Sequence, residues 1–315
     1  MKCALFPSRR RKKVRSKDND ALKKYLEARK RIVDEALKQY VPGDDAYPPS
    51  LCKAVRYSIF AGGKRLRPIL CMAAAEAVGG DSDAVLPVAC ALEMIHTYSL
   101  IHDDLPAMDD DEYRRGRLTN HKVFGEGMAI LAGDALLTEA FCLMASGGAV
   151  AGGDGKRLLT VIHEIAHSAG LFGMVGGQAV DLESEGKEVD SETLHYIHTH
   201  KTAALLQVSL RAGAILAGGG PQELTGLTQY GAKIGLAFQI ADDILDVEGD
   251  VEVLGKETGC DGERKKATYP ALIGLEPSRT RARELVDEAL TDLSSFDECA
   301  DPLRMIARFI VDRTS

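Results

Sequence analysis

Two aspartate-rich stretches carry the residues with the clearest chemistry in this sequence. Residues 103–109 read DDLPAMD, and residues 242–246 read DDILD. Two carboxylates about 4 Å apart repel each other by about 4 kcal/mol at an effective dielectric constant of about 20. Carboxylate oxygens without histidine or cysteine partners suit Mg²⁺, which fills its remaining positions with water and phosphate oxygens. The two stretches therefore predict two carboxylate sites that face each other across a diphosphate.

The spacing of the aspartates predicts how each stretch is held. Asp242 and Asp246 stand one helical turn apart, so their side chains point the same way. Apolar residues recur at steps of three and four over residues 227–244, as on the buried face of a helix. The polar stripe beside them comprises Gln239, Asp242, Asp243 and Asp246. In the first stretch Pro106 interrupts the helix. Asp109 can then reach the site of Asp103 only if residues 105–108 form a short loop that turns back.

Basic residues occur beside these acidic motifs. They are Lys64, Arg65, Arg67, Arg114, Arg115, Lys201, Lys256 and Lys266. Beyond its first seventeen residues the chain holds 31 of its 39 basic residues against 47 acidic ones, a net charge of −16. In so acidic a chain, basic residues near the aspartate motifs are not expected by chance. They suit the binding of a second anion beside the diphosphate. GGKRLRP is not a Walker A loop, because the chain contains no GxxxxGK[ST] sequence. His96 lies seven residues before Asp103, on the same helix face.

The remainder of the chain predicts one all-α domain. Of its 315 residues 45% are apolar and 27% are charged, and aromatic residues are few. Glycine- and proline-rich breaks separate about ten helical segments, and no break is long or polar enough to be an interdomain linker. No uncharged stretch reaches the ~18 to 20 apolar residues that a bilayer span needs, so we expect no membrane insertion.

The first twenty residues differ from the rest. Eight of the first seventeen are Lys or Arg and none is acidic. Such a segment could bind nucleic acid or an anionic surface, but we interpret residues 1–20 as a disordered extension before a domain over 21–315, with no nucleic-acid partner. The seven cysteines form no CxxC pair, which argues against a zinc ribbon or a disulfide framework and favours a cytoplasmic location.

A zinc-hydrolase motif gives an alternative function. Residues 163–167 read HEIAH, which matches the HExxH signature of two histidine ligands and a glutamate base. The position of the third ligand in the related metzincin pattern holds Gly173. A chance match on a charged helix face is the better interpretation, and a zinc hydrolase remains a remote alternative.

Taken together, the motifs resemble those of the trans-isoprenyl diphosphate synthases. GGKRLRP, EMIHTYSLIHDDLPAMDDDEYRRG, GMVGGQAVDLESEG, HKTAAL, GLAFQIADDILDV, LGKETG and TYPALIGLE follow the family's motifs in order. The four-residue spacing in DDLPAMD looks most like the bacterial farnesyl diphosphate synthases, also called geranyltranstransferases. The resemblance implies the isoprenoid synthase fold, a bundle of helices around a central substrate cavity, and a homodimer.

The resemblance also implies a role for each matching residue. About three Mg²⁺ ions would be held by Asp103, Asp104, Asp109, Asp242, Asp243 and Asp246. The allylic diphosphate would contact Arg114, Lys201 and Lys256. Isopentenyl diphosphate would bind, without metal, to Lys64, Arg67, His96 and Arg115. Lys266 matches a further basic position, and the allylic cation would be shielded by Thr202, Gln239 and the carbonyl of Lys201.

The implied reaction condenses dimethylallyl and geranyl diphosphate with isopentenyl diphosphate to give farnesyl diphosphate. The departing diphosphate gains negative charge, which metal ions and cations stabilise. Product length in the family depends on the side chains four and five residues before the first aspartate, here Ser99 and Tyr98. Tyr98 lies about 7.5 Å along the helix from Asp103 but off its face, so core packing is the other interpretation of this side chain. We expect a C15 product, with the C20 product geranylgeranyl diphosphate as the alternative.

Overall fold

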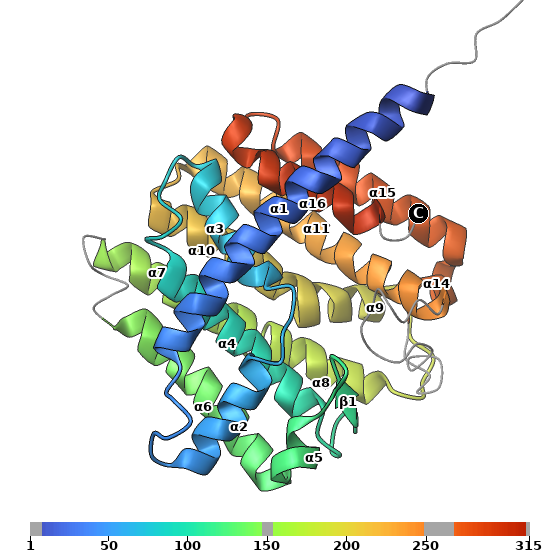
Figure 1. The fold of residues 1–315 in the computed structure, drawn as a ribbon. Helices are drawn as coiled ribbons and strands as arrows, with labels where there is room; N and C mark the ends of the chain where they lie inside the picture. The colour runs from blue at the N-terminus through green and yellow to red at the C-terminus, as the bar shows by residue number, and fades with distance from the viewer. Residues whose placement is uncertain (1–7, 147–153, 249–267, 313–315) are drawn as a thin grey trace, which may run out of the picture.

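The computed structural model describes residues 8–146, 154–248 and 268–312, which form a helical bundle (Figure 1). The α-helices are α1 (Ser8–Tyr40), α2 (Pro49–Ile59), α3 (Leu66–Ala77), α4 (Leu86–Asp103), α5 (Asn120–Phe124), α6 (Glu126–Ala145), α7 (Gly155–Ala169), α8 (Met174–Ser184), α9 (Ser191–Ile197), α10 (Ala204–Ala217), α11 (Pro221–Glu248), α14 (Tyr269–Ile273), α15 (Leu275–Asp292) and α16 (Asp301–Asp312). A π-helix η2 (His198–Ala203), a 3-10 helix η3 (Glu298–Ala300) and a hairpin of β1 (Tyr113–Arg114) and β2 (Arg117–Leu118) complete the described elements. The all-α class predicted from the sequence is confirmed.

Two apolar clusters form the core, and α3 and α10 contribute to both. One cluster takes Met72 from α3 and Val208 from α10, together with residues of α4 and α6. The other takes Leu70 and Leu210 from the same two helices, together with residues of α11, α15 and α16. α3 and α10 pack closely, because a Cβ on Gly213 would lie 1.9 Å from the carbonyl oxygen of Cys71. This pair of helices therefore joins α4 to α11, the two helices that carry the aspartate motifs.

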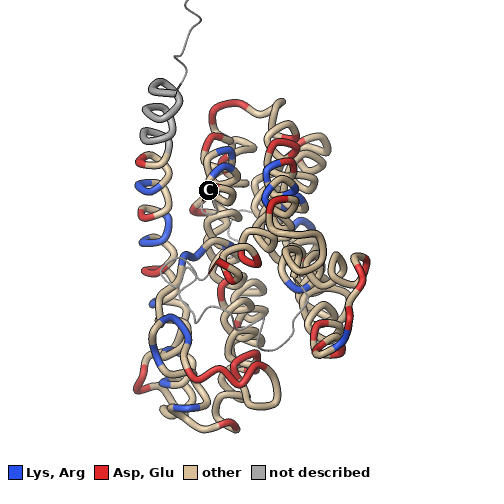
Figure 2. Tube along the Cα trace, turned by 90° about the vertical axis from the view of Figure 1, so that its right-hand side faces the viewer, with Lys and Arg blue, Asp and Glu red and all other residues tan. Residues whose placement is uncertain are grey.

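Helix α1 begins earlier than the sequence analysis predicted. It lies across the bundle, and its first turns project beyond the other helices (Figure 1). The sequence analysis expected a disordered extension over residues 1–20, whereas the structure describes a helix from Ser8, and Lys and Arg are good helix formers. Basic and acidic residues both occur along the coloured part of α1 in Figure 2, below its first turns. Leu22, Val33 and Leu37 anchor the rest of α1 in the core.

Two segments of the described residues are long and apolar enough to cross a membrane by length and composition. They are Glu126–Ala145 and Gly155–Ser184, with mean hydropathies of 1.6 and 1.4. The first is α6, which packs against α4, and the second divides into α7 and α8. Only 33% of each window is buried, and large apolar side chains such as Leu131 and Leu159 are exposed on these segments.

Candidate active site

The first aspartate motif lies where α4 ends. Asp103 is the last residue of α4, and Pro106 prevents the helix from continuing. The chain then turns back, and the backbone N–H of Asp109 donates to the carbonyl of Asp103 at 2.8 Å. The predicted loop is therefore present. Asp104 points into the protein, where it is 3% exposed and accepts from Nε of Arg114 at 2.5 Å. Burial raises the pKa of Asp104, and the contact with Arg114 opposes that rise.

A tight hairpin presents the two arginines that follow this motif. Arg115 and Gly116 connect β1 to β2, and both have positive φ, at 55° and 73°. Two successive positive φ values are typical of the turns that fit the twist of a hairpin. Arg115 donates to the carbonyl of Gly62, and a Cβ on Gly63 would lie 2.7 Å from its Nη1. The guanidinium of Arg115 thus lies directly against Gly63, in the loop that carries Lys64.

Three of the four residues predicted to bind isopentenyl diphosphate, Arg67, His96 and Arg115, form one cluster in which the two arginines carry the positive charge. Burial, reinforced by the charge of Arg115, lowers the pKa of Arg67 to about 10. Burial lowers the pKa of His96 well below 6.5, and Arg67 and Arg115 reinforce the effect. Because Arg115 lowers the pKa of Arg67, and both arginines lower that of His96, a bound anion would relieve the crowding of positive charge here. The carboxylate of Asp242 raises the pKa of Arg67, which places this cluster within electrostatic reach of the second motif. Lys64, the fourth residue, is exposed.

Arg65 differs from its basic neighbours because it is buried. Its guanidinium bonds to Asp34 of α1 and Glu93 of α4, each at 2.8 Å, and donates to the carbonyl of Ile59 at 2.7 Å. With three partners and a side chain only 1% exposed, Arg65 is not available to a ligand. Arg65 therefore fastens the loop carrying Lys64 to two helices.

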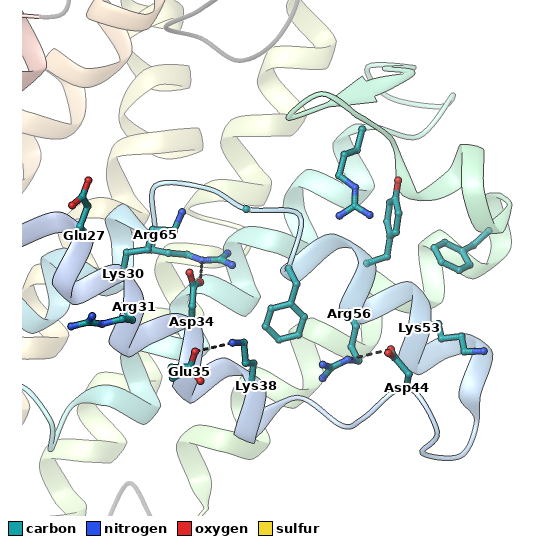
Figure 3. Close-up of a pocket in the computed structure, with 15 residues that line it drawn as sticks. Glu27, Lys30, Arg31, Asp34, Glu35, Lys38, Asp44, Lys53, Arg56 and Arg65 are labelled. Atoms are coloured by element: carbon teal, nitrogen blue, oxygen red, sulfur yellow. Dashed lines mark hydrogen bonds and ion pairs between the residues drawn. The ribbon is translucent and has the colours of Figure 1, made fainter. Parts of the chain in front are cut away.

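A broad hollow lies on the other side of this loop, between α1 and α2 (Figure 3). Its volume is about 910 Å³. The residues that line it form ion pairs, such as Arg56 with Asp44 and Lys38 with Glu35. None of the predicted site residues lines it. A smaller pocket is lined by Asp104, Arg114 and Arg115, and so belongs to the first motif.

The second aspartate motif lies on α11, and its three carboxylates have different surroundings. Asp242 is half-buried, whereas Asp243 and Asp246 are buried. Asp243 accepts from Nε2 of Gln239 at 3.1 Å and from the backbone N–H of Tyr269 at 3.0 Å. Gln239 in turn accepts from the hydroxyl of Thr202 at 2.9 Å. Three of the predicted site residues thus form one hydrogen-bonded chain.

Lys201 and Thr202 lie in the π-helix η2, a geometry that often occurs at functional sites. Two glycines allow its neighbours to come close. A Cβ on Gly177 of α8 would lie 2.3 Å from the backbone nitrogen of Lys201, and one on Gly235 of α11 would lie 2.5 Å from Cβ of Ala203. Nζ of Lys201 pairs with Asp181 of α8 at 2.5 Å. The sequence analysis gave Asp181 no role, although the motif GMVGGQAVDLESEG contains it.

The two residues expected to limit product length lie on α4. Tyr98 is 6% exposed, belongs to the core cluster and meets His102 edge to face, with ring centroids 5.7 Å apart. Burial raises the pKa of Tyr98 to about 12, and the charge of Asp103 adds to the rise. Ser99 donates to the carbonyl of His96 at 2.9 Å. Tyr98 therefore packs in the core within electrostatic reach of the first aspartate.

The carboxylates suit Mg²⁺ through their chemistry. Among the residues that the structure describes, no three His, Cys, Asp or Glu side chains converge closely enough to hold a metal ion alone. Mg²⁺ usually takes one or two carboxylates and completes its shell with water and phosphate oxygens. Asp103, Asp109 and Asp242 are half-buried and so reach solvent, whereas Asp104 and Asp243 are buried, Asp104 against Arg114 and Asp243 against Gln239. Lys256 and Lys266 lie outside the described residues.

The HEIAH sequence on α7 does not form a hydrolase site. Glu164 makes two bonds of 2.7 Å to the guanidinium of Arg211, so it is not available as a general base. His163 and His167 are exposed, with ring centroids 6.4 Å apart. Glu164 instead joins α7 to α10.

Comparison with known proteins agrees with this geometry. The family model for polyprenyl synthetase matches residues 48–303. The chain belongs to the polyprenyl synthetase family. It is 50% identical to a geranylgeranyl diphosphate synthase of Cyanophora paradoxa, over 92% of this chain and 96% of that protein. It is 46% identical to a farnesyl diphosphate synthase of Geobacillus stearothermophilus, over 93% of this chain and 98% of that protein.

The fold of this polyprenyl synthetase matches a solved relative. The apo crystal structure of an FPP/GFPP synthase from Zymomonas mobilis superposes with a TM-score of 0.83 at 40% identity, covering 92% of this chain and 99% of that one. The chain is thus a trans-prenyl diphosphate synthase that joins an allylic diphosphate to isopentenyl diphosphate. Relatives of similar identity carry names for different products, so identity alone does not select the product length.

Proposed function

We propose that this enzyme is a Mg²⁺-dependent farnesyl diphosphate synthase. Tyr98 carries the proposal for the C15 product, because it is a buried aromatic residue five positions before Asp103, on the helix that ends at the first motif. Its ring occupies space that a longer product would need. Geranylgeranyl diphosphate is the second candidate, supported by the relative from Cyanophora paradoxa.

In the proposed reaction the chain binds two diphosphates and shields a cation. Lys64, Arg67 and Arg115 hold isopentenyl diphosphate, while Arg114 and Lys201 face the allylic diphosphate. When bound, Mg²⁺ neutralises the charge that develops on the leaving diphosphate. The C–O bond ionises, and the double bond of isopentenyl diphosphate attacks the allylic carbon. The released diphosphate then accepts the proton that the product loses, so no covalent nucleophile is required.

The enzyme class is tested with purified protein, dimethylallyl and isopentenyl diphosphate, and Mg²⁺. We expect a prenyl diphosphate product, no product in EDTA, and almost none in Asp103→Asn or Asp242→Asn. Asp110→Asn is the matched control, because Asp110 is exposed on the same loop and its φ of 48° suits Asn. Product formation that persists in EDTA, or an equal loss in all three variants, would contradict the proposal.

We also propose that the enzyme is a homodimer built on α6, α7 and the start of α8. These helices expose large apolar side chains, among them Leu131, Leu159, Leu171, Phe172 and Val175. Leu171 and Phe172 are 71% and 69% exposed, which is unusual for neighbours on a monomer surface. A two-fold dimer would pair this surface with itself. Sedimentation should give twice the chain mass of 33.9 kDa, and Leu171→Glu should shift it toward the monomer. A monomeric wild type would contradict the proposal.

A further inference from the structure

Asp243 is enclosed by protein groups on both of its carboxylate oxygens. Oδ1 accepts from the amide of Gln239, and Oδ2 accepts from the backbone N–H of Tyr269. Nε2 of His198 lies 3.5 Å from Oδ2, and the His198 ring stacks on Tyr269 with centroids 5.3 Å apart. Asp243 is 3% exposed, whereas Asp242 beside it is half-buried. Asp242 and Asp243 are adjacent in the DDILD motif, but their side chains therefore lie in different environments.

The carboxylate of Asp243 determines which way the Gln239 amide points. An ionised carboxylate only accepts hydrogen bonds, so it must face the NH₂ group of the amide. Oε1 of Gln239 then lies on the opposite side, where it accepts from the Thr202 hydroxyl. The hydrogen bonds run in one direction, from Thr202 through Gln239 to Asp243.

This direction fixes the Thr202 hydroxyl as well. A hydroxyl has one proton and two lone pairs, and the proton of Thr202 is directed at Gln239. The remaining lone pairs are free to point at positive charge. A hydroxyl that rotates freely can instead turn its proton toward that charge, which is repulsive. Polar groups that are fixed before the reaction stabilise developing charge most effectively.

We propose that Asp243 is a positioning residue which, through Gln239, holds the Thr202 oxygen toward the allylic cation, and that Asp243 is not a ligand of Mg²⁺. This inference rests on the proposed prenyltransferase reaction. It departs from the expectation that all three aspartates of the second motif bind metal.

Asp243→Asn tests the direction of the chain. The backbone N–H of Tyr269 still needs an acceptor, so the amide introduced by this substitution presents its oxygen to Tyr269 and its NH₂ group to Gln239. The Gln239 amide then turns over, and Thr202 accepts a hydrogen bond and directs its proton at the cation. We expect kcat to fall about 100-fold, the effect typical of losing one fixed polar contact. The KM values and the Mg²⁺ concentration for half-maximal rate should stay within a few-fold of wild type. Asp292→Asn on α15 removes the partner of Lys233 of α11, and the Asp292 side chain is 10% exposed. It is the control for loss of an ion-paired carboxylate away from the site and should keep kcat.

A double-mutant cycle with Thr202→Val separates positioning from folding. If Asp243 acts through the Thr202 hydroxyl, Asp243→Asn has little effect on kcat in the Thr202→Val background. Metal binding is read without turnover, as the rise in Tm caused by Mg²⁺ with inorganic diphosphate. We expect that rise to persist in Asp243→Asn and to vanish in Asp242→Asn. An equal loss of kcat in both backgrounds, or loss of the Tm rise in Asp243→Asn, overturns the inference. If wild type forms no prenyl product, the proposed function fails instead.

Discussion

Gly177→Ala tests whether α8 positions the π-helix that carries Lys201 and Thr202. The added Cβ would lie 2.3 Å from the backbone nitrogen of Lys201 and 2.8 Å from its Cα, where ordinary contacts are 3.4–4 Å. Both contacts are with backbone, so either α8 or η2 has to move by about 1 Å. Overpacking of this kind costs about 1–3 kcal/mol, partly offset by the better helix propensity of Ala, about 1 kcal/mol. We expect the free energy of unfolding to fall by no more than about 2 kcal/mol.

The larger effect of Gly177→Ala should be on turnover. A displacement of about 1 Å at a reacting group costs about 100-fold in rate. Urea unfolding measures the stability term, and steady-state kinetics with dimethylallyl and isopentenyl diphosphate measure kcat. Gly127→Ala on α6 is the matched control, because its Cβ meets nothing within 4 Å, and it should be as active as wild type. A Gly177→Ala enzyme with wild-type kcat would refute the argument that this contact positions the site.

Three further predictions follow from individual side chains. Tyr98→Ala should lengthen the main product from C15 to C20, because the buried ring no longer blocks the growing chain; an unchanged product would show that Tyr98 only packs the core. Arg65→Ala leaves Glu93 buried without its partner and should lower the free energy of unfolding by about 3–5 kcal/mol in urea, whereas a loss below about 1 kcal/mol would contradict its structural role. His96 has a lowered pKa in the folded state, so the unfolded chain binds its proton first and stability falls as pH drops below 6.5. His96→Gln should reduce that pH dependence in urea unfolding, and an unchanged slope would show that His96 is not its source.

The fold and the location of the motifs could be predicted because they depend on local patterns. Apolar residues spaced by three and four predicted the buried face of α11, and Leu227, Ile234 and Ile244 on that face are buried. Glycine and proline breaks separated most of the helices for the same reason. Pro106 correctly indicated that α4 ends at the first motif.

The separate roles of neighbouring residues could not be predicted, because they depend on distant partners. Lys64 and Arg65 look alike in the sequence, yet only Arg65 is buried, since Asp34 and Glu93 come from other helices. The side chains of adjacent residues project about 100° apart on a helix, so the two aspartates of each pair point in different directions. The inward member of the first pair meets Arg114, and that of the second meets the backbone N–H of Tyr269.

The product formed by the wild-type enzyme tests the central claim most directly. Purified protein is incubated with Mg²⁺, dimethylallyl diphosphate and an excess of labelled isopentenyl diphosphate, and the dephosphorylated products are separated by chain length. We predict that the C15 alcohol is the main product even when isopentenyl diphosphate is in excess, because Tyr98 limits further elongation. A main product of C20, or no condensation at all, would contradict the assignment.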